Sequence, residues 1–166
     1  MNRLKLVVVG PTECGKSCLC NLLSESVEQV TEEYRPTCGV RIIEYELNTT
    51  IANKPCKVEL ELWDLSGNKK YENCWPACFK GSHGIIFVHN PDHSEHIKEL
   101  EDCNKKSKTD RDEVSLPSAL APFQHLTCCI FEEAEKLRDQ FEKFVSHLIT
   151  CRQEATEQEE LNIINT

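Results

Sequence analysis

Eight consecutive residues near the N-terminus, Gly10 to Ser17, have the types and the spacing needed to hold a polyphosphate. They read Gly-Pro-Thr-Glu-Cys-Gly-Lys-Ser, with four residues between the two glycines. In such a loop the main-chain amides turn inward around a β-phosphate, Lys16 bridges the β- and γ-phosphates, and the Ser17 hydroxyl is a ligand for Mg²⁺. The predicted nucleotide contacts of this loop are Gly10, Thr12, Glu13, Cys14, Gly15, Lys16, Ser17 and Cys18.

Two further motifs supply groups for a metal ion and a third phosphate. In Trp-Asp-Leu-Ser-Gly at residues 63–67, the Asp64 carboxylate is suited to hold Mg²⁺ through water and the Gly67 amide to meet a γ-phosphate. Thr37 ends the segment Tyr-Arg-Pro-Thr and is suited to both tasks, although an ordinary proline-containing loop is the alternative. The predicted metal ligands are therefore Ser17, Thr37 and Asp64.

The elements that must position these motifs alternate between strands and helices. Residues 4–9 form a nearly continuous apolar run, typical of a strand buried on both faces of a parallel sheet. Residues 40–47 and 58–63 alternate apolar with polar residues on either side of turn-forming residues at 48–55, which predicts an antiparallel hairpin, and residues 84–89 predict another buried strand. We expect an α/β fold of the P-loop NTPase type, with a doubly wound, mostly parallel sheet that contains one antiparallel hairpin and is flanked by helices.

The C-terminal part of the chain predicts one long helix. Apolar residues recur at steps of three and four over residues 134–151, which describes a single apolar stripe that should cover the sheet. We expect one nucleotide-binding domain over residues 1–151, followed by an acidic, polar extension over residues 152–166 that is frayed or tail-like. Before the helix, residues 105–122 predict a loop and residues 123–128 a strand.

Composition excludes several classes of function. A net charge of -9 disfavours binding to nucleic acid, which needs clustered lysine and arginine. The sequence contains no apolar run near the roughly 20 residues that span a bilayer, and the last five residues hold no cysteine for a prenyl anchor, so a cytoplasmic protein without a direct membrane anchor is expected. The eleven cysteines are predicted to be free thiols, because their number is odd, no signal peptide is present, and no paired Cys-x-x-Cys spacing indicates zinc.

These motifs carry a resemblance to known proteins. Residues 4–90 resemble the Ras and Rab superfamily of small GTPases, with looser agreement over the C-terminal helix. Three segments, at residues 34–44, 61–64 and 71–77, are more narrowly similar to the Rab-like proteins of intraflagellar transport. The resemblance implies binding of GTP or GDP with Mg²⁺, membership of train complex B in cilium or flagellum assembly, and a location in the cytoplasm, the cilium and its base.

The same resemblance implies two switch segments, residues 34–37 and 64–79, that order around a γ-phosphate. It also implies a partner surface for other transport subunits, helical or coiled-coil, formed by residues 34–37 with Tyr71, Trp75 and Phe79. Packing of Trp75 and Phe79 into the core is the alternative, because the two are at helical spacing.

Two residues differ from the superfamily pattern at positions that affect GTP hydrolysis. Thr12 stands where Ras-type enzymes have glycine, and Asn68 stands where they have the glutamine that orients the attacking water. Asparagine is one methylene shorter, so its amide falls short of that water, and the Thr12 side chain crowds the same space. We predict a nucleotide-holding adaptor with slow or absent hydrolysis. An active GTPase timer is the alternative, and a nucleotide kinase is a third class that would need an arginine-bearing lid.

Base recognition also departs from the pattern. Asn104, Lys105 and Ser107 resemble the Asn-Lys-x-Asp motif that reads guanine, but a neutral hydroxyl replaces the carboxylate, so ATP binding is open, as is a merely solvated lysine-rich loop. Residues 93–103, before this motif, provide only a short helix and no apolar strand, so roughly 15 to 20 residues of a normal crossover are absent. Either the fold is abbreviated or a stretch near Glu101 to Cys103 has been omitted.

Overall fold

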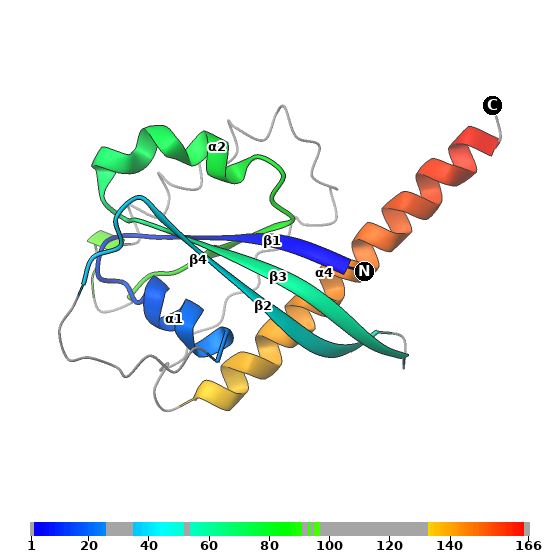
Figure 1. Cartoon of the computed structure of the whole chain (residues 1–166), viewed down its shortest axis with the longest axis horizontal. Helices are drawn as coiled ribbons and strands as arrows, with labels where there is room; N and C mark the ends of the chain where they lie inside the picture. The colour runs from blue at the N-terminus through cyan, green and yellow to red at the C-terminus, as the bar shows by residue number, and fades with distance from the viewer. Residues whose placement is uncertain are drawn as a thin grey trace.

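A four-stranded mixed sheet is the centre of the structure. The computed structural model describes residues 2–25, 35–51, 54–90, 93, 95–96 and 133–164. In this part of the chain the sheet order is β2-β3-β1-β4, formed by β1 (Asn2–Val9), β2 (Val40–Ile51), β3 (Lys54–Leu65) and β4 (Gly84–Phe87) (Figure 1). β1 pairs in parallel with β3 and β4, whereas β2 and β3 are antiparallel, so the expected α/β fold with one antiparallel hairpin is confirmed.

The hairpin is longer than the sequence pattern predicted. Residues 48–55 were expected to form the turn, but β2 continues to Ile51, and Thr49 pairs with Cys56 across the two strands. β-branched residues favour extended backbone. The Thr49 side chain is also buried and shares a 2.9 Å hydrogen bond with the Ser146 hydroxyl of the C-terminal helix. Tertiary packing thus keeps these polar residues in the strand.

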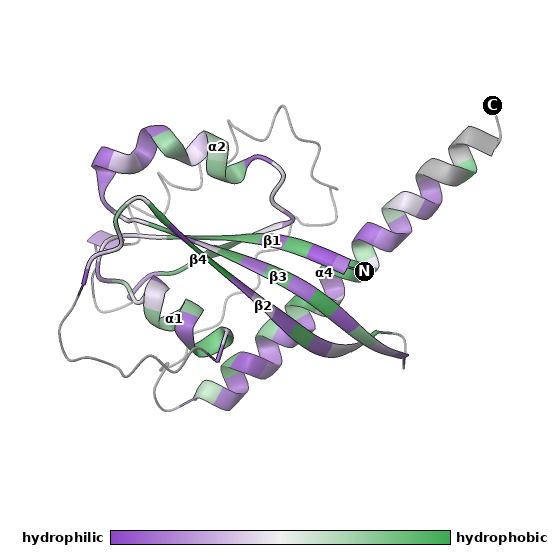
Figure 2. Cartoon of the chain, viewed as in Figure 1, coloured by the Kyte–Doolittle hydropathy of each residue, from purple (hydrophilic) through white to green (hydrophobic). Residues whose placement is uncertain are grey.

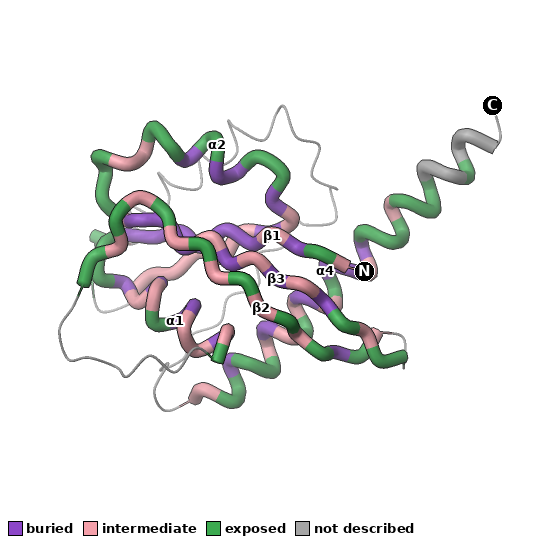
Figure 3. Tube along the Cα trace, in the orientation of Figure 1, coloured by how far each residue is buried: buried purple, intermediate pink, exposed green. Residues whose placement is uncertain are grey.

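Helices cover both faces of the sheet. On one face lie α1 (Lys16–Leu23) and α4 (Ala134–Ile164), and on the other lie the 3-10 helix η1 (Lys69–Cys74) and α2 (Trp75–Phe79) (Figure 1). β1 contributes side chains to the cores on both faces of the sheet. Leu4, Leu6 and Val8 belong to the larger core under α1 and α4. Val7 and Val9 belong to the smaller core under α2. This two-sided burial explains the apolar run of β1, which Lys5 alone interrupts between Leu4 and Val9; the strand is mostly hydrophobic in Figure 2 and mostly buried in Figure 3.

The long C-terminal helix agrees with the predicted apolar stripe and extends beyond it. Leu137, Phe141, Val145 and Leu148 are all buried against the sheet. The helix then continues to Ile164, so the extension that was expected to be frayed or tail-like is helical, and its described residues after Cys151 are mostly exposed (Figure 3). The division into a domain at 1–151 and an extension at 152–166 stays a prediction.

Several sequence predictions fall outside the described residues: the loop at 105–122, the strand at 123–128, and most of the short helix expected after His93. Among the helices that the structure describes, none combines the length and the hydrophobicity that a membrane crossing requires.

His83 makes the stability of the sheet depend on pH. Its Nδ1 accepts a 2.9 Å hydrogen bond from the Lys5 amide and must therefore be unprotonated. Burial, together with the nearby charge of Arg152, lowers the pKa of His83 below its usual 6.5. The unfolded chain consequently binds more protons near and below pH 6.5, so the free energy of unfolding should fall as the pH drops through that range. Urea unfolding of wild type and His83→Asn at pH 5.5 and 7.5 checks this, and an equal pH slope in both proteins would contradict it.

Candidate phosphate and metal site

The loop between β1 and α1 has the backbone shape of an anion-binding concavity. Glu13 has φ 62° and Gly15 has φ 94°, both in the left-handed region, and Gly15 caps the N-terminus of α1. Turns that alternate hands in this way point successive amide N–H groups to the same side. The helix dipole adds partial positive charge at that point. The predicted phosphate loop therefore has a suitable backbone.

The second motif packs directly on this loop. A Cβ atom placed on Gly67 would lie 2.4 Å from the amide nitrogen of Thr12 and 2.5 Å from the carbonyl carbon of Pro11, both of them backbone atoms. Only glycine fits at that separation. The close approach brings the end of β3, with its carboxylate, to the mouth of the loop.

Lys16 holds its ammonium inside the loop. The residue is 6 % exposed, and Nζ donates to the carbonyl oxygens of Gly10 at 3.0 Å and Pro11 at 2.5 Å. Nζ also lies 3.6 Å from Sγ of Cys14, whose pKa is raised by burial although the Lys16 charge opposes the rise. Cys14 is therefore a neutral thiol that packs in the loop. Two main-chain carbonyls thus hold the ammonium inside the predicted phosphate loop.

Three oxygen-bearing side chains from distant parts of the sequence meet at the first turn of α1, next to Lys16 in the chain. The Ser17 hydroxyl donates to Oδ2 of Asp64 at 2.7 Å and lies 2.9 Å from the Thr37 hydroxyl. Thr37 Oγ1 is itself 3.5 Å from the same carboxylate oxygen. The structure thus brings together all three predicted metal ligands.

These residues fit a magnesium ion by their chemistry. Asp64 is fully buried, and among the residues that the structure describes its Oδ1 has no hydrogen-bond partner. A buried carboxylate oxygen without a partner is unfavourable unless a cation or a polar ligand approaches it. Hydroxyl and carboxylate oxygens are also the ligand types that Mg²⁺ prefers.

Thr12 and Asn68, the two residues that depart from the Ras-type pattern, lie at the mouth of the site. Both are exposed. Asn68 caps η1, because its Oδ1 accepts a 3.1 Å hydrogen bond from the amide of Lys70. Its side chain is thus held toward the helix that follows. Of the remaining predicted contacts, Glu13 and Cys18 are exposed, and Asn104, Lys105 and Ser107 lie outside the described residues.

The prediction of an aromatic partner surface was wrong for two of its residues, Trp75 and Phe79. Trp75 and Phe79 are each 4 % exposed and pack edge to face, with ring centroids 6.4 Å apart, in the core under α2. Helical spacing places both rings on the face of α2 that covers β1, and burial of that face stabilises the layer. Tyr71 is half-buried under the Lys70 ammonium, and Tyr34 lies outside the described residues.

Arg41 belongs to the site and was not predicted. In the register of the hairpin it stands opposite Asp64, and its Nη2 is 3.3 Å from Oδ2 of that carboxylate. The alternating pattern of β2 placed Arg41 on one face, but only the pairing with β3 identifies its partner.

Comparisons with known proteins agree with this geometry. The family model described as "Ras of Complex, Roc, domain of DAPkinase" matches residues 5–115. The chain is 35 % identical to an intraflagellar transport protein 22 homolog of Danio rerio and 34 % identical to that of Homo sapiens, with 99 % of this chain and 100 % of each relative covered. Both alignments span 186 positions, 20 more than this chain has residues, so the relatives contain residues with no counterpart here.

Among solved structures, the GTP-bound crystal structure of T. brucei IFT22/74/81 contains a chain with the same fold. The TM-score is 0.63 at 24 % sequence identity, and the match covers 93 % of this chain and 99 % of the other. At that identity the likeness supports the fold.

Proposed function

The chain belongs to the intraflagellar transport protein 22 family of Ras-like GTPase domains, and from this premise we propose that it is a GTP-binding, Rab-like subunit of the intraflagellar transport machinery. The observation that carries the proposal is the convergence of Ser17, Thr37 and Asp64 at the N-terminus of α1, where the phosphate loop encloses the Lys16 ammonium. An ammonium, a backbone nest and three oxygen ligands together match a nucleotide triphosphate with its Mg²⁺.

Each group has a stated task in this proposal. Lys16 and the loop amides bind the phosphates, and the Ser17 and Thr37 hydroxyls with the Asp64 carboxylate hold Mg²⁺. The bound Mg²⁺ neutralises phosphate charge. The short distance between Gly67 and the phosphate loop supports a role for the Gly67 amide at the third phosphate. Guanine is the proposed base, on the support of the family, with Asn104, Lys105 and Ser107 as its proposed contacts.

We further propose that the protein holds its nucleotide with little turnover. The support is local: Asn68 uses its side-chain oxygen to accept the amide of Lys70, and its side chain is one methylene shorter than glutamine. Thr12 stands exposed at the same mouth. An adaptor that keeps its nucleotide bound as part of its structure requires slow hydrolysis. A GTPase that acts as a timer requires rapid hydrolysis.

The proposed partners are other intraflagellar transport subunits, and the proposed location is the cytoplasm, the cilium or flagellum and its base. The relatives' names support this assignment, as does the IFT22/74/81 assembly in which the structurally similar chain was crystallised. Because Trp75 and Phe79 are buried, we place the contact on exposed residues near the site instead. Val40 and Ile42 are 38 % and 47 % exposed on the edge strand β2, close in sequence to Thr37.

Two measurements on the purified full chain test this function. Mass spectrometry of the co-purifying nucleotide should identify GTP or GDP, and ATP would contradict the guanine assignment. In single-turnover assays the wild type should release phosphate slowly, and Thr12→Gly combined with Asn68→Gln should release it at least about tenfold faster, because glutamine reaches the attacking water. Asn73→Gln is the matched control, since it makes the same chemical change at an exposed position of η1. Rapid hydrolysis by the wild type would favour the timer.

A further inference from the structure

Arg41 links the metal-binding carboxylate to the phosphate loop. Its Nη2 is 3.3 Å from Asp64 Oδ2 and donates to the carbonyl oxygen of Ser17, also at 3.3 Å. The Arg41 side chain is 35 % exposed, whereas that of Asp64 is 0 % exposed. A half-buried guanidinium therefore sits against a fully buried carboxylate, on the side of β2.

The same carboxylate oxygen serves both the guanidinium and the metal ligands. Oδ2 of Asp64 accepts the Ser17 hydroxyl at 2.7 Å, and the Thr37 hydroxyl lies 3.5 Å away. A positive charge this close to a carboxylate attracts it strongly and repels any divalent cation that the carboxylate holds. Arginine keeps its charge at every physiological pH, so this effect is permanent.

We propose that Arg41 is a built-in counter-cation of the nucleotide site, which weakens Mg²⁺ binding and makes nucleotide retention less dependent on Mg²⁺. The inference rests on the proposed GTP binding. When Mg²⁺ leaves a site that lacks such a cation, the bare carboxylate repels the phosphates. Here the guanidinium offsets the charge of Asp64, so much of that repulsion is absent. Arg41 acts through Asp64 and is a positioning residue.

A purely structural role is the competing explanation, because an ion pair between opposite residues of a hairpin also stabilises the strand pairing. The two roles differ in what they change. A structural pair alters the unfolding temperature and leaves the response to Mg²⁺ unchanged. A counter-cation alters the response to Mg²⁺ itself.

The test uses the full chain loaded with a fluorescent GTP analogue. Nucleotide dissociation is followed in Mg²⁺ and in EDTA, and the ratio of the two rates measures dependence on the metal. In Arg41→Gln this ratio should rise about tenfold over wild type, and Mn²⁺ titration followed by electron paramagnetic resonance should show tighter metal binding, because the repelling charge is gone. Arg41→Lys retains the charge and should stay near wild type.

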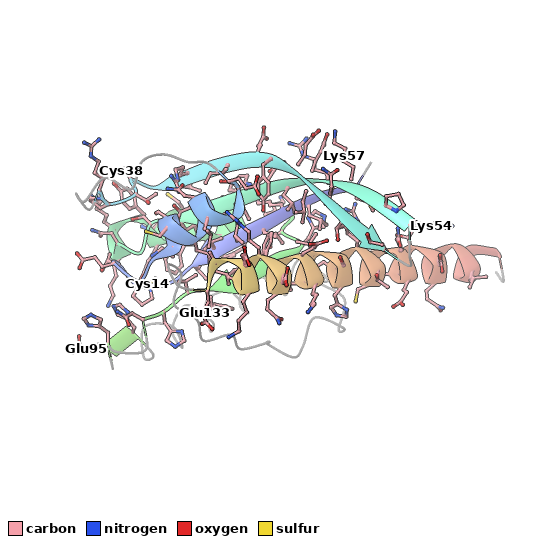
Figure 4. The ribbon with its side chains drawn as sticks, turned by 90° about the horizontal axis from the view of Figure 1, so that it is seen from below. Cys14, Cys38, Lys54, Lys57, Glu95 and Glu133 are labelled. Carbon is pink, nitrogen blue, oxygen red and sulfur yellow. The ribbon has the colours of Figure 1, made fainter. Side chains whose placement is uncertain are left out.

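Lys57→Gln is the matched control. It also removes one positive charge from the hairpin, but its partner is Glu46, at 2.7 Å. Figure 4 shows Lys57 toward one end of the molecule, with Cys14 of the phosphate loop and Cys38 toward the other. Its EDTA-to-Mg²⁺ ratio should equal that of the wild type.

The outcomes distinguish a failure of the counter-cation role from a failure of the proposed GTP binding. A wild-type chain that fails to bind the analogue overturns the proposed function. If the wild type binds, an equal ratio in Arg41→Gln and Lys57→Gln overturns the counter-cation role. If Arg41→Gln does not fold, the wild type alone decides: acceleration by EDTA of more than about a hundredfold overturns the role, and a smaller one supports it, since a hundredfold corresponds to full loss of a strong ionic contact.

Discussion

Replacing Lys16 with alanine should weaken GTP binding at least about a hundredfold, because a phosphate then loses charge-assisted hydrogen bonds inside a buried loop. The expected effect is large because the ammonium is already fixed by the carbonyl oxygens of Gly10 and Pro11, so binding requires little further ordering. Isothermal titration calorimetry with GTP and Mg²⁺ on nucleotide-free protein provides the measurement.

Lys70→Ala is the control for the loss of a lysine. Lys70 is exposed and lies 4.7 Å over the ring of Tyr71, so its removal should leave GTP affinity unchanged. Circular dichroism shows whether each variant is folded at the temperature of the titration. Unchanged affinity in a folded Lys16→Ala chain would remove the basis for the proposed function.

Replacing Gly10 with alanine should lower the free energy of unfolding by at least about 3 kcal/mol, the range of severe steric substitutions. A Cβ atom at Gly10 would lie 2.0 Å from the carbonyl oxygen of Val88 and 3.0 Å from Cys14 Sγ. The Val88 oxygen belongs to the backbone just after β4, and the Val88 amide already donates to Val9. This steric clash can be relieved only if β1 separates from the chain after β4. Urea unfolding of the wild type and Gly10→Ala measures the resulting loss of stability.

Gly81→Ala separates this steric effect from the cost of backbone conformation. Gly81 has φ +69°, and a Cβ atom added there would meet no atom of the described part of the chain within 4 Å, so alanine should cost only about 1 to 2 kcal/mol. Equal losses at the two positions would contradict the close approach of Val88 to Gly10.

The phosphate loop was predictable because its signal is local. The spacing of Gly10, Gly15 and Lys16 determines a backbone turn and a side-chain position within one short segment that joins a strand to a helix. The spacing of Trp75 and Phe79 likewise predicted that both lie on one face of a helix, but spacing alone does not indicate which face of that helix packs against the sheet. The structure buries that face against β1, and the predicted partner surface therefore failed there.

The amino-acid sequence by itself determined the strand-loop-helix unit, the hairpin and the stripe of the last helix, because periodicity and turn chemistry act over a few residues. The motifs predicted Ser17, Thr37 and Asp64 as ligands of one metal ion, but only the tertiary structure gave their mutual contacts and placed Arg41 against Asp64. Those four residues span 48 positions of the chain and meet through the parallel pairing of β1 with β3 and the register of β2 with β3. Register depends on which side chains the whole core can bury together, and no single segment contains that information.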